Sequence, residues 1–140
     1  MRHLVVVALL FAMPVSGAGS AADQLLVSVT NVASGRGTVV AMVCDQASFL
    51  ASCAFKGAAA ASTTGRVTIA FHGVPRGKYA VVVFHDENDN RRLDRDALGI
   101  PTEGYGYSRA ARGHGGPPRF EDAAFDFGGS ESTIEVVLDY

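Results

Sequence analysis

Several short segments of this chain alternate apolar with polar or small residues, and this alternation constrains the fold more than any other feature. It appears in residues 25–30, 66–72 and 134–140. Successive side chains of an extended strand point to opposite faces, so each segment predicts a strand with one buried and one wet face. No segment shows a comparable run of helical periodicity; residues 120–123 are expected to form one helical turn at most.

Two further segments are apolar on both faces and rich in valine, residues 38–43 and 79–84. Such segments are typical of central strands that are covered on both sides. Residues 125–127 place two phenylalanines around an aspartate and predict another short strand.

Glycine, proline and serine mark turns between these strands. Residues 34–37 indicate a hairpin turn between the first two strands, residues 75–78 a tight turn, and residues 128–130 the turn into the last strand. Short strands with turn signals at this spacing predict an all-β fold, a single antiparallel β-sandwich of about seven strands.

The first residues predict export. A basic start precedes an apolar run at residues 4–13, and a proline and several small residues follow. This order is typical of a secretory signal peptide, here residues 1–22, cleaved after Ala22 to leave a domain of residues 23–140. The alternative is a buried N-terminal strand or helix. The run is shorter than the roughly 20 residues of a membrane span, so we expect a periplasmic or secreted product.

Charge excludes one class of partner. Lys and Arg number 12 against 14 Asp and Glu, a formal net charge of −2, and no basic stripe appears along the sequence. Nucleic acid is therefore not an expected partner. No second long apolar stretch follows residue 22, so no membrane span is expected either.

Cys44 and Cys53 are the only cysteines. In an oxidising compartment an even pair at short spacing predicts a disulfide, which would stabilise the fold by about 2.5–3 kcal/mol. The alternative is two buried free thiols.

One stretch breaks the strand pattern. Residues 88–120 are rich in glycine and proline and are too long for a structureless connection in a compact domain. Loops of this size are usually functional or held by something specific.

The start of this stretch carries the clearest chemical pattern. Asp86, Asn88, Asn90 and Asp94 form D-x-N-x-N-x-x-x-D, the spacing of positions 1, 3, 5 and 9 of an EF-hand loop. Arg92 falls at position 7, where only a backbone carbonyl is needed. Ca²⁺ takes six to eight oxygen ligands, so the spacing predicts a calcium site.

The pattern departs from an EF-hand in two places. Arg91 stands where the EF-hand has glycine, and Ala97 cannot supply the final bidentate carboxylate. Asp96 or Glu103 would have to complete the ligand set. The alternative interpretation is an Asx-rich turn whose side chains bond their own backbone.

Tyr105 and Tyr107 lie on the glycine-rich part of the same stretch. They are a candidate ligand surface that stacks on a glycan or a protein partner. The alternative is that both rings cover the open end of the sandwich core.

A catalytic role has less support. Asp86, Asp94 and Glu103 could in principle act as catalytic carboxylates, which would require a concave pocket around them. His85 next to Asp86 suggests zinc or acid–base chemistry, but a histidine at a strand end is more often packed or exposed. We expect no enzyme and assign no catalytic residue.

The order of motifs in residues 71–124 resembles a known family. F-x-G-V-P-x-G-x-Y-A-V is followed by H-D-E-N-x-N-x-x-L-D, L-G-I-P-T-E-G-Y-G-Y-S and G-P-P-x-F-E-D-A. This series resembles the exported bacterial family known as domain of unknown function 2141. Residues 74–79 are more weakly similar to the turn of transthyretin-like and carboxypeptidase-regulatory-like sandwiches. These resemblances imply an Ig-like fold and an accessory or ligand-binding role.

Overall fold

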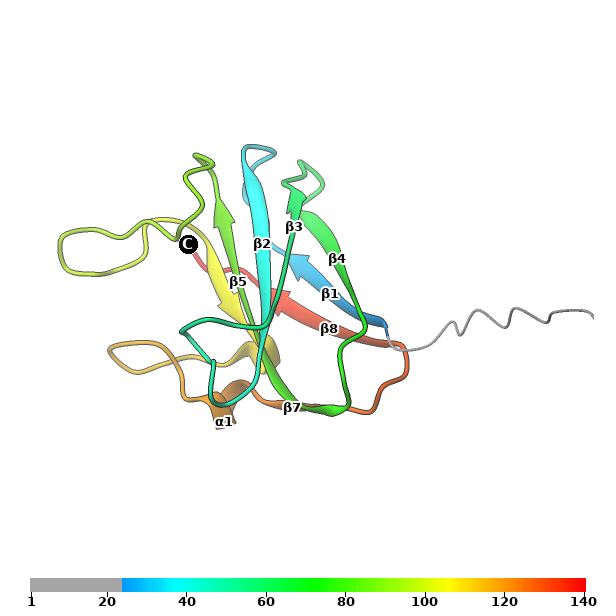
Figure 1. Ribbon diagram of the computed structural model, residues 1–140. Helices are drawn as coiled ribbons and strands as arrows, with labels where there is room; N and C mark the ends of the chain where they lie inside the picture. The colour runs from blue at the N-terminus through cyan, green and yellow to red at the C-terminus, as the bar shows by residue number, and fades with distance from the viewer. Residues whose placement is uncertain (1–23) are drawn as a thin grey trace, which may run out of the picture.

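A computed structural model of the protein describes residues 24–140 and shows eight strands and very little helix (Figure 1). The expected signal peptide at residues 1–22 lies outside the described residues. The elements are β1 (Gln24–Thr30), β2 (Thr38–Cys44), β3 (Phe55–Ala60), β4 (Arg66–His72), β5 (Gly77–Asp86), β6 (Tyr105–Tyr107), the 3-10 turn η1 (Ser108–Ala110), α1 (Phe120–Ala123), β7 (Phe125–Phe127) and β8 (Ser132–Val137).

The strands form two sheets of a β-sandwich. One sheet has the order β4-β1-β8, and the other has the order β3-β2-β5-β6 with β7 pairing alongside β5. The predicted all-β sandwich is confirmed, with eight strands in place of about seven. All pairings are antiparallel except that of β1 with β8, which is parallel. Neither helical turn among residues 24–140 is long or apolar enough to cross a bilayer.

The predicted hairpin at residues 34–37 is wrong. Strands β1 and β2 lie in different sheets, so the connection crosses from one sheet to the other. Strand β1 pairs with β4 and β8, whereas strand β2 pairs with β3 and β5. Gly37, with φ +69°, ends the crossing, and a Cβ there would lie 2.0 Å from the Asp86 carbonyl oxygen. The crossing therefore passes directly against the end of β5.

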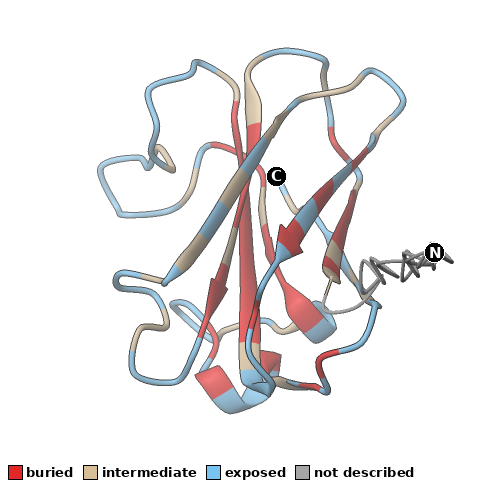
Figure 2. Ribbon diagram, turned by 45° about the vertical axis from the view of Figure 1, so that its right-hand side comes forward, coloured by how far each residue is buried: buried red, intermediate tan, exposed pale blue. Residues whose placement is uncertain are grey.

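The main core lies between the two sheets and is built from aliphatic and phenylalanine side chains. Figure 2 shows buried residues along the strands, with the connecting loops mostly exposed. The largest fully buried side chains of this core are Phe127, Leu25, Leu138, Val27, Val29, Val39, Val43, Val81, Val83 and Val136. Their burial on the inner faces is the main stabilising contribution to the fold.

A second apolar cluster covers the outer face of β2 and β5. It contains Cys44, Ala80, Val82, Tyr107, Phe120, Ala123 and Ala124. The predicted disulfide between Cys44 and Cys53 is present, with the two Cα atoms 4.6 Å apart. The disulfide holds residues 45–52, which we call the disulfide loop, over this face. In this loop the Phe49 ring packs edge-on against Phe120, with ring centroids 5.7 Å apart. The two-sided apolar pattern of both strands thus corresponds to cover on both faces.

The chain end closes the sandwich beside β6. Tyr105 N–H donates to the Asp139 carbonyl at 3.0 Å, and Asp139 N–H donates back at 2.9 Å. A Cβ at Gly106 would lie 2.4 Å from the Val137 carbonyl oxygen, so only glycine allows this approach of the two backbones. The end of the chain therefore joins the edge of the five-stranded sheet to β8.

A buried histidine links this chain end to the first crossing. His85 is fully buried, with Nε2 2.7 Å from the Arg36 carbonyl and Nδ1 2.8 Å from the Tyr140 hydroxyl. A carbonyl only accepts, so Nε2 carries the proton. The Tyr140 hydroxyl also accepts the Ala33 N–H at 2.9 Å. Both ring nitrogens of His85 therefore have hydrogen-bond partners within the fold.

Replacing Tyr140 with phenylalanine should lower the free energy of unfolding by about 1–3 kcal/mol, because Nδ1 of buried His85 loses its hydrogen-bond partner. The measurement is equilibrium unfolding in urea. Tyr79→Phe is the matched control, since its exposed hydroxyl bonds only the Pro75 carbonyl and its loss should cost less. Equal losses in the two variants would contradict a structural role for the His85 network.

Candidate functional site

The long stretch predicted from the sequence is an excursion that leaves β5 and returns to α1. Strand β5 continues to Asp86, so the excursion is defined as residues 87–119. It is not structureless, because it contains β6 and η1. Figure 1 shows two of its loops, residues 95–101 and residues 112–118, projecting from the same side of the sandwich. We call these loops the first arm and the second arm.

Asp86 organises the start of the excursion from a buried position. It is 2% exposed, and its Oδ1 and Oδ2 accept the backbone N–H groups of Asn90 at 3.0 Å and Arg91 at 2.7 Å. Arg91 adopts φ +69°, the left-handed conformation for which the EF-hand pattern requires glycine. This conformation costs an arginine about 1–2 kcal/mol, which the two hydrogen bonds offset.

Three polar side chains that follow Asp86 in the chain are joined by hydrogen bonds. Asn88 Nδ2 lies 2.6 Å from Asp94 Oδ2, and Asn90 Nδ2 lies 2.7 Å and 2.9 Å from the two Asp94 oxygens. The hydrogen bonds from Asn90 and then Asn88 lower the pKa of the Asp94 carboxyl, and the charge of Arg92 adds to them. The Arg92 Nε lies 3.6 Å from Asp94 Oδ1 at the exposed side.

Both asparagines also form Asx turns. Asn88 Oδ1 accepts the Asn90 N–H at 3.1 Å, and Asn90 Oδ1 accepts the Arg92 N–H at 3.2 Å. The structure thus contains the hydrogen-bonded turns of the alternative interpretation. In these turns the amide oxygens accept backbone N–H groups, while the amide nitrogens donate to Asp94.

Glu103 holds the two ends of the loop through hydrogen bonds to its backbone. It is 6% exposed, and its two oxygens accept the N–H groups of Glu87 and Asp94, both at 3.0 Å. The loop that Asp86 opens is therefore closed by a second buried carboxylate. Neither Asp86 nor Glu103 forms an ion pair with a basic side chain in residues 24–140.

The structure brings most of the predicted metal-site residues together. The side chains of Asn88 and Asn90 both bond Asp94. Asp86 accepts the Asn90 backbone N–H, and Glu103 accepts the Asp94 backbone N–H. Asp96, the other residue considered for completing the shell, instead accepts two N–H groups within the first arm, at 2.8 and 2.9 Å. Within the described part of the chain, no three His, Cys, Asp or Glu side chains are grouped to hold a metal. Any ion here would therefore depend on the asparagine oxygens.

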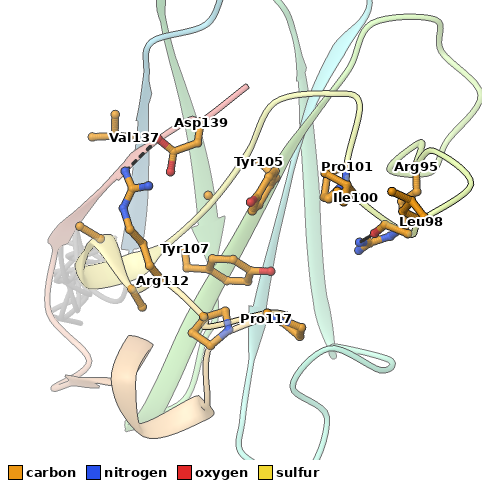
Figure 3. Close-up of a pocket in the computed structure, with 18 residues that line it drawn as sticks. Arg95, Leu98, Ile100, Pro101, Tyr105, Tyr107, Arg112, Pro117, Val137 and Asp139 are labelled. Atoms are coloured by element: carbon orange, nitrogen blue, oxygen red, sulfur yellow. Dashed lines mark hydrogen bonds and ion pairs between the residues drawn. The ribbon is translucent and has the colours of Figure 1, made fainter.

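A cleft of about 430 Å³ opens between the two arms. Figure 3 shows Tyr105 and Tyr107 on its floor, with Arg112 on one side and Pro101 and Ile100 on the other. Arg112 is ion-paired with Asp139 at 2.9 Å. The first arm presents Leu98, which is 84% exposed, and Ile100, which is 57% exposed.

The two tyrosines do not form a flat platform. Tyr107 is 8% exposed and belongs to the second apolar cluster, so it covers the sheet as the alternative interpretation expects. The Tyr105 ring is only partly buried and meets Tyr107 edge-on, with centroids 6.1 Å apart. Burial, followed by the nearby Tyr105, raises the pKa of Tyr107. Neither hydroxyl forms a hydrogen bond with a described residue.

A second hollow of about 260 Å³ lies on the other side of the tyrosines. It shares Arg95, Tyr105 and Tyr107 with the cleft. Its other lining residues include Met42, Leu50, Lys56, Val82, Phe84, Arg91, Arg92 and Leu93. The sequence analysis did not identify Arg95 or Lys56, because residues of the disulfide loop, β3 and the excursion meet here only in the folded chain.

The carboxylates considered for catalysis do not line either hollow. Asp86, Asp94 and Glu103 are absent from both sets of lining residues. Both oxygens of Asp86 and of Glu103 are bonded to backbone N–H groups. Both ring nitrogens of His85 are also bonded within the fold. This arrangement favours holding a loop in shape over moving protons.

Comparison with known proteins gives one match. A family model described as "Uncharacterized protein conserved in bacteria (DUF2141)" matches residues 27–135. No curated protein and no solved structure matches the chain. The matched range contains nearly all of both sheets, the excursion and both hollows.

Replacing Glu103 with glutamine should loosen the start of the excursion. The amide nitrogen cannot accept, so the Glu87 or Asp94 N–H loses its partner at a local cost of about 1–3 kcal/mol. Amide hydrogen exchange of these two groups should accelerate roughly tenfold or more, with amides of β2 unchanged. Glu131→Gln, at an exposed position, is the matched control. Unchanged exchange at both amides would show that Glu103 is not a brace.

Proposed function

The chain belongs to the DUF2141 family of uncharacterized bacterial proteins, and because this membership carries no activity, we propose its function from the geometry of the excursion. The protein is an exported, non-catalytic binding module. Ca²⁺ held by residues 86–94 gives the excursion its working shape, and residues 99–120 form the recognition surface.

The observation that carries the calcium proposal is the pair of buried carboxylates. Asp86 and Glu103 are 2% and 6% exposed, and no basic side chain among the described residues pairs with either. Buried charges in proteins are usually paired or coordinate a metal. Asp94 adds a third carboxylate at the exposed mouth of the same loop. A divalent cation would neutralise this local excess of negative charge.

The side chains that would hold the ion are Asp86, Asn88, Asn90 and Asp94, together with the Arg92 carbonyl. The asparagine oxygens are already oriented by Asx turns. Their amide nitrogens now donate to Asp94, so binding requires these amides and Asp94 to exchange partners. Ca²⁺ accepts carboxylate, amide and carbonyl oxygens in a flexible shell that water completes. Glu103 would keep its position beneath the loop.

Two features support export. Residues 1–22 have the order of a signal peptide, and a Cys44–Cys53 disulfide is the expected form of a cysteine pair outside the reducing cytosol. Calcium modules of the cell exterior work with dissociation constants of roughly 10⁻⁴–10⁻³ M. An incomplete EF-hand pattern is suited to this affinity range.

The position of the hollows supports binding over catalysis. Neither hollow is lined by Asp86, Asp94, Glu103 or His85. Stacking of a glycan on Tyr105 and Tyr107 has less support, because Tyr107 is buried and the rings meet edge-on. The arms and the floor between them are the better candidates for contact with a partner.

The test is thermal unfolding of the protein in 10 mM CaCl₂ and in EDTA. A site with a dissociation constant of about 1 mM should add about 1.4 kcal/mol, a rise in Tm of roughly 3–8 °C. Asp94→Asn should remove the rise, because the loop loses its exposed carboxylate. Asp126→Asn, an exposed acid on β7, is the control and should keep it. Identical melting curves in Ca²⁺ and EDTA would rule the site out.

A further inference from the structure

The cleft and the second hollow adjoin each other, and we call the two together the trough. They meet at Arg95, Tyr105 and Tyr107, which line both. The trough therefore extends from the second arm, across the two tyrosines, to the disulfide loop and β3. A ligand that filled both hollows would have to span Arg95, Tyr105 and Tyr107, which favours an extended ligand over a compact one.

The trough is basic in a chain that is acidic as a whole. Five of the 12 Lys and Arg residues line it: Lys56, Arg91, Arg92, Arg95 and Arg112. Its only acidic lining residue is Asp139, which is already ion-paired with Arg112. The chain contains 14 acidic residues, so their near absence from this surface concentrates positive potential there.

Hydrogen-bond donors in the middle of the trough are free for a ligand. Arg95 donates from one nitrogen to the Gly99 carbonyl at 3.0 Å and forms no ion pair with a described residue. The hydroxyls of Tyr105 and Tyr107 have no partner among the described residues. Burial keeps the pKa of Tyr107 raised even though the charge of Arg95 lowers it, so its hydroxyl remains a donor. These free donor groups have no acceptor partner among the described residues, and a ligand carboxylate would supply one.

The remaining surface of the trough is apolar. Met42, Val82 and Phe84 line the second hollow, and Leu98 and Ile100 line the cleft from the first arm. Leu98 and Ile100 are 84% and 57% exposed, so the first arm offers two large apolar side chains that a partner could cover. Acidic glycans offer few apolar groups for such a surface, whereas a peptide offers apolar side chains and carboxylates together.

We propose that the trough binds an extended acidic peptide segment of a partner protein, with its carboxylates at Arg95 and the neighbouring basic residues and its apolar side chains against the floor and first arm. The proposal rests on the binding-module function proposed above but not on the metal. Residues 86–94, which would hold the ion, form what we call the polar loop. Arg91 and Arg92 belong to both the polar loop and the trough, so Ca²⁺ would affect their positions. The hydrogen bonds of Asp86 and Glu103 hold the same loop without an ion.

The test uses isothermal titration calorimetry with three synthetic peptides that alternate leucine with glutamate, serine or lysine. The Glu–Leu peptide should bind at least tenfold more tightly than the Ser–Leu peptide, and the Lys–Leu peptide should not bind. Binding should weaken as salt is raised, because the basic residues are exposed to solvent. Polygalacturonate is titrated in parallel as an acidic glycan. Its binding in place of the Glu–Leu peptide would overturn the proposal in favour of a glycan.

Two variants locate the site. Arg95→Gln and Lys56→Gln should each weaken binding of the Glu–Leu peptide about fivefold or more. Lys56 is an exposed residue of β3, so we expect its replacement to leave the fold intact. Arg76→Gln removes an exposed charge between β4 and β5, outside the trough, and should change nothing. Equal weakening in all three variants, or none in any, would overturn the proposal.

Running every titration in Ca²⁺ and in EDTA separates this proposal from the calcium proposal. Peptide binding in both buffers with identical melting curves would retain the trough and reject the ion. A calcium-dependent Tm with no binding of the Glu–Leu peptide in either buffer would retain the ion and reject the trough.

Discussion

Burial of strand β5 on both faces is the constraint on which the rest of the structure depends. Its inner face belongs to the core between the sheets, and its outer face would expose Ala80, Val82 and Phe84 without further cover. The disulfide loop, β6 and α1 supply that cover from three distant parts of the chain. The disulfide loop and β6 also line the trough, whereas α1 does not. The recognition surface is thus a by-product of shielding a central strand, which explains why its residues are far apart in sequence.

The polar end of β5 connects segments of the fold that are distant in sequence. His85 and Asp86 are buried side chains that need hydrogen-bond partners, and each obtains them from a different segment. His85 bonds the first crossing and the chain end through Arg36 and Tyr140, whereas Asp86 bonds the start of the excursion. The first crossing, the chain end and the start of the excursion therefore meet at one point. Disturbing this point affects the excursion and the closing chain end together.

The sequence predicts those features that depend on local chemistry. Alternating and valine-rich segments correspond to β1, β2, β4, β5, β7 and β8, and the cysteine pair forms the expected disulfide. Strand β3 was missed because its glycine and alanines have low strand propensity, and β6 because Tyr105–Tyr107 is too short to show periodicity. The first crossing was misassigned because a turn signal does not specify whether the next strand lies beside or opposite the last. The basic walls of the trough depend on tertiary contacts alone.

The polar loop and the trough are electrostatically connected. Arg91 and Arg92 lie between Asn90 and Asp94 in the loop, and both line the trough, whereas Asn90 and Asp94 are among the proposed ligands of the ion. An ion held by the loop would draw Asp94 away from Arg92, which it now faces at 3.6 Å, and would leave that arginine free for an anionic ligand. By linkage, an acidic ligand that occupied Arg92 would favour the ion by the same factor. Placing arginines between metal ligands, which weakens the resemblance to an EF-hand, would then be the feature that couples the two sites.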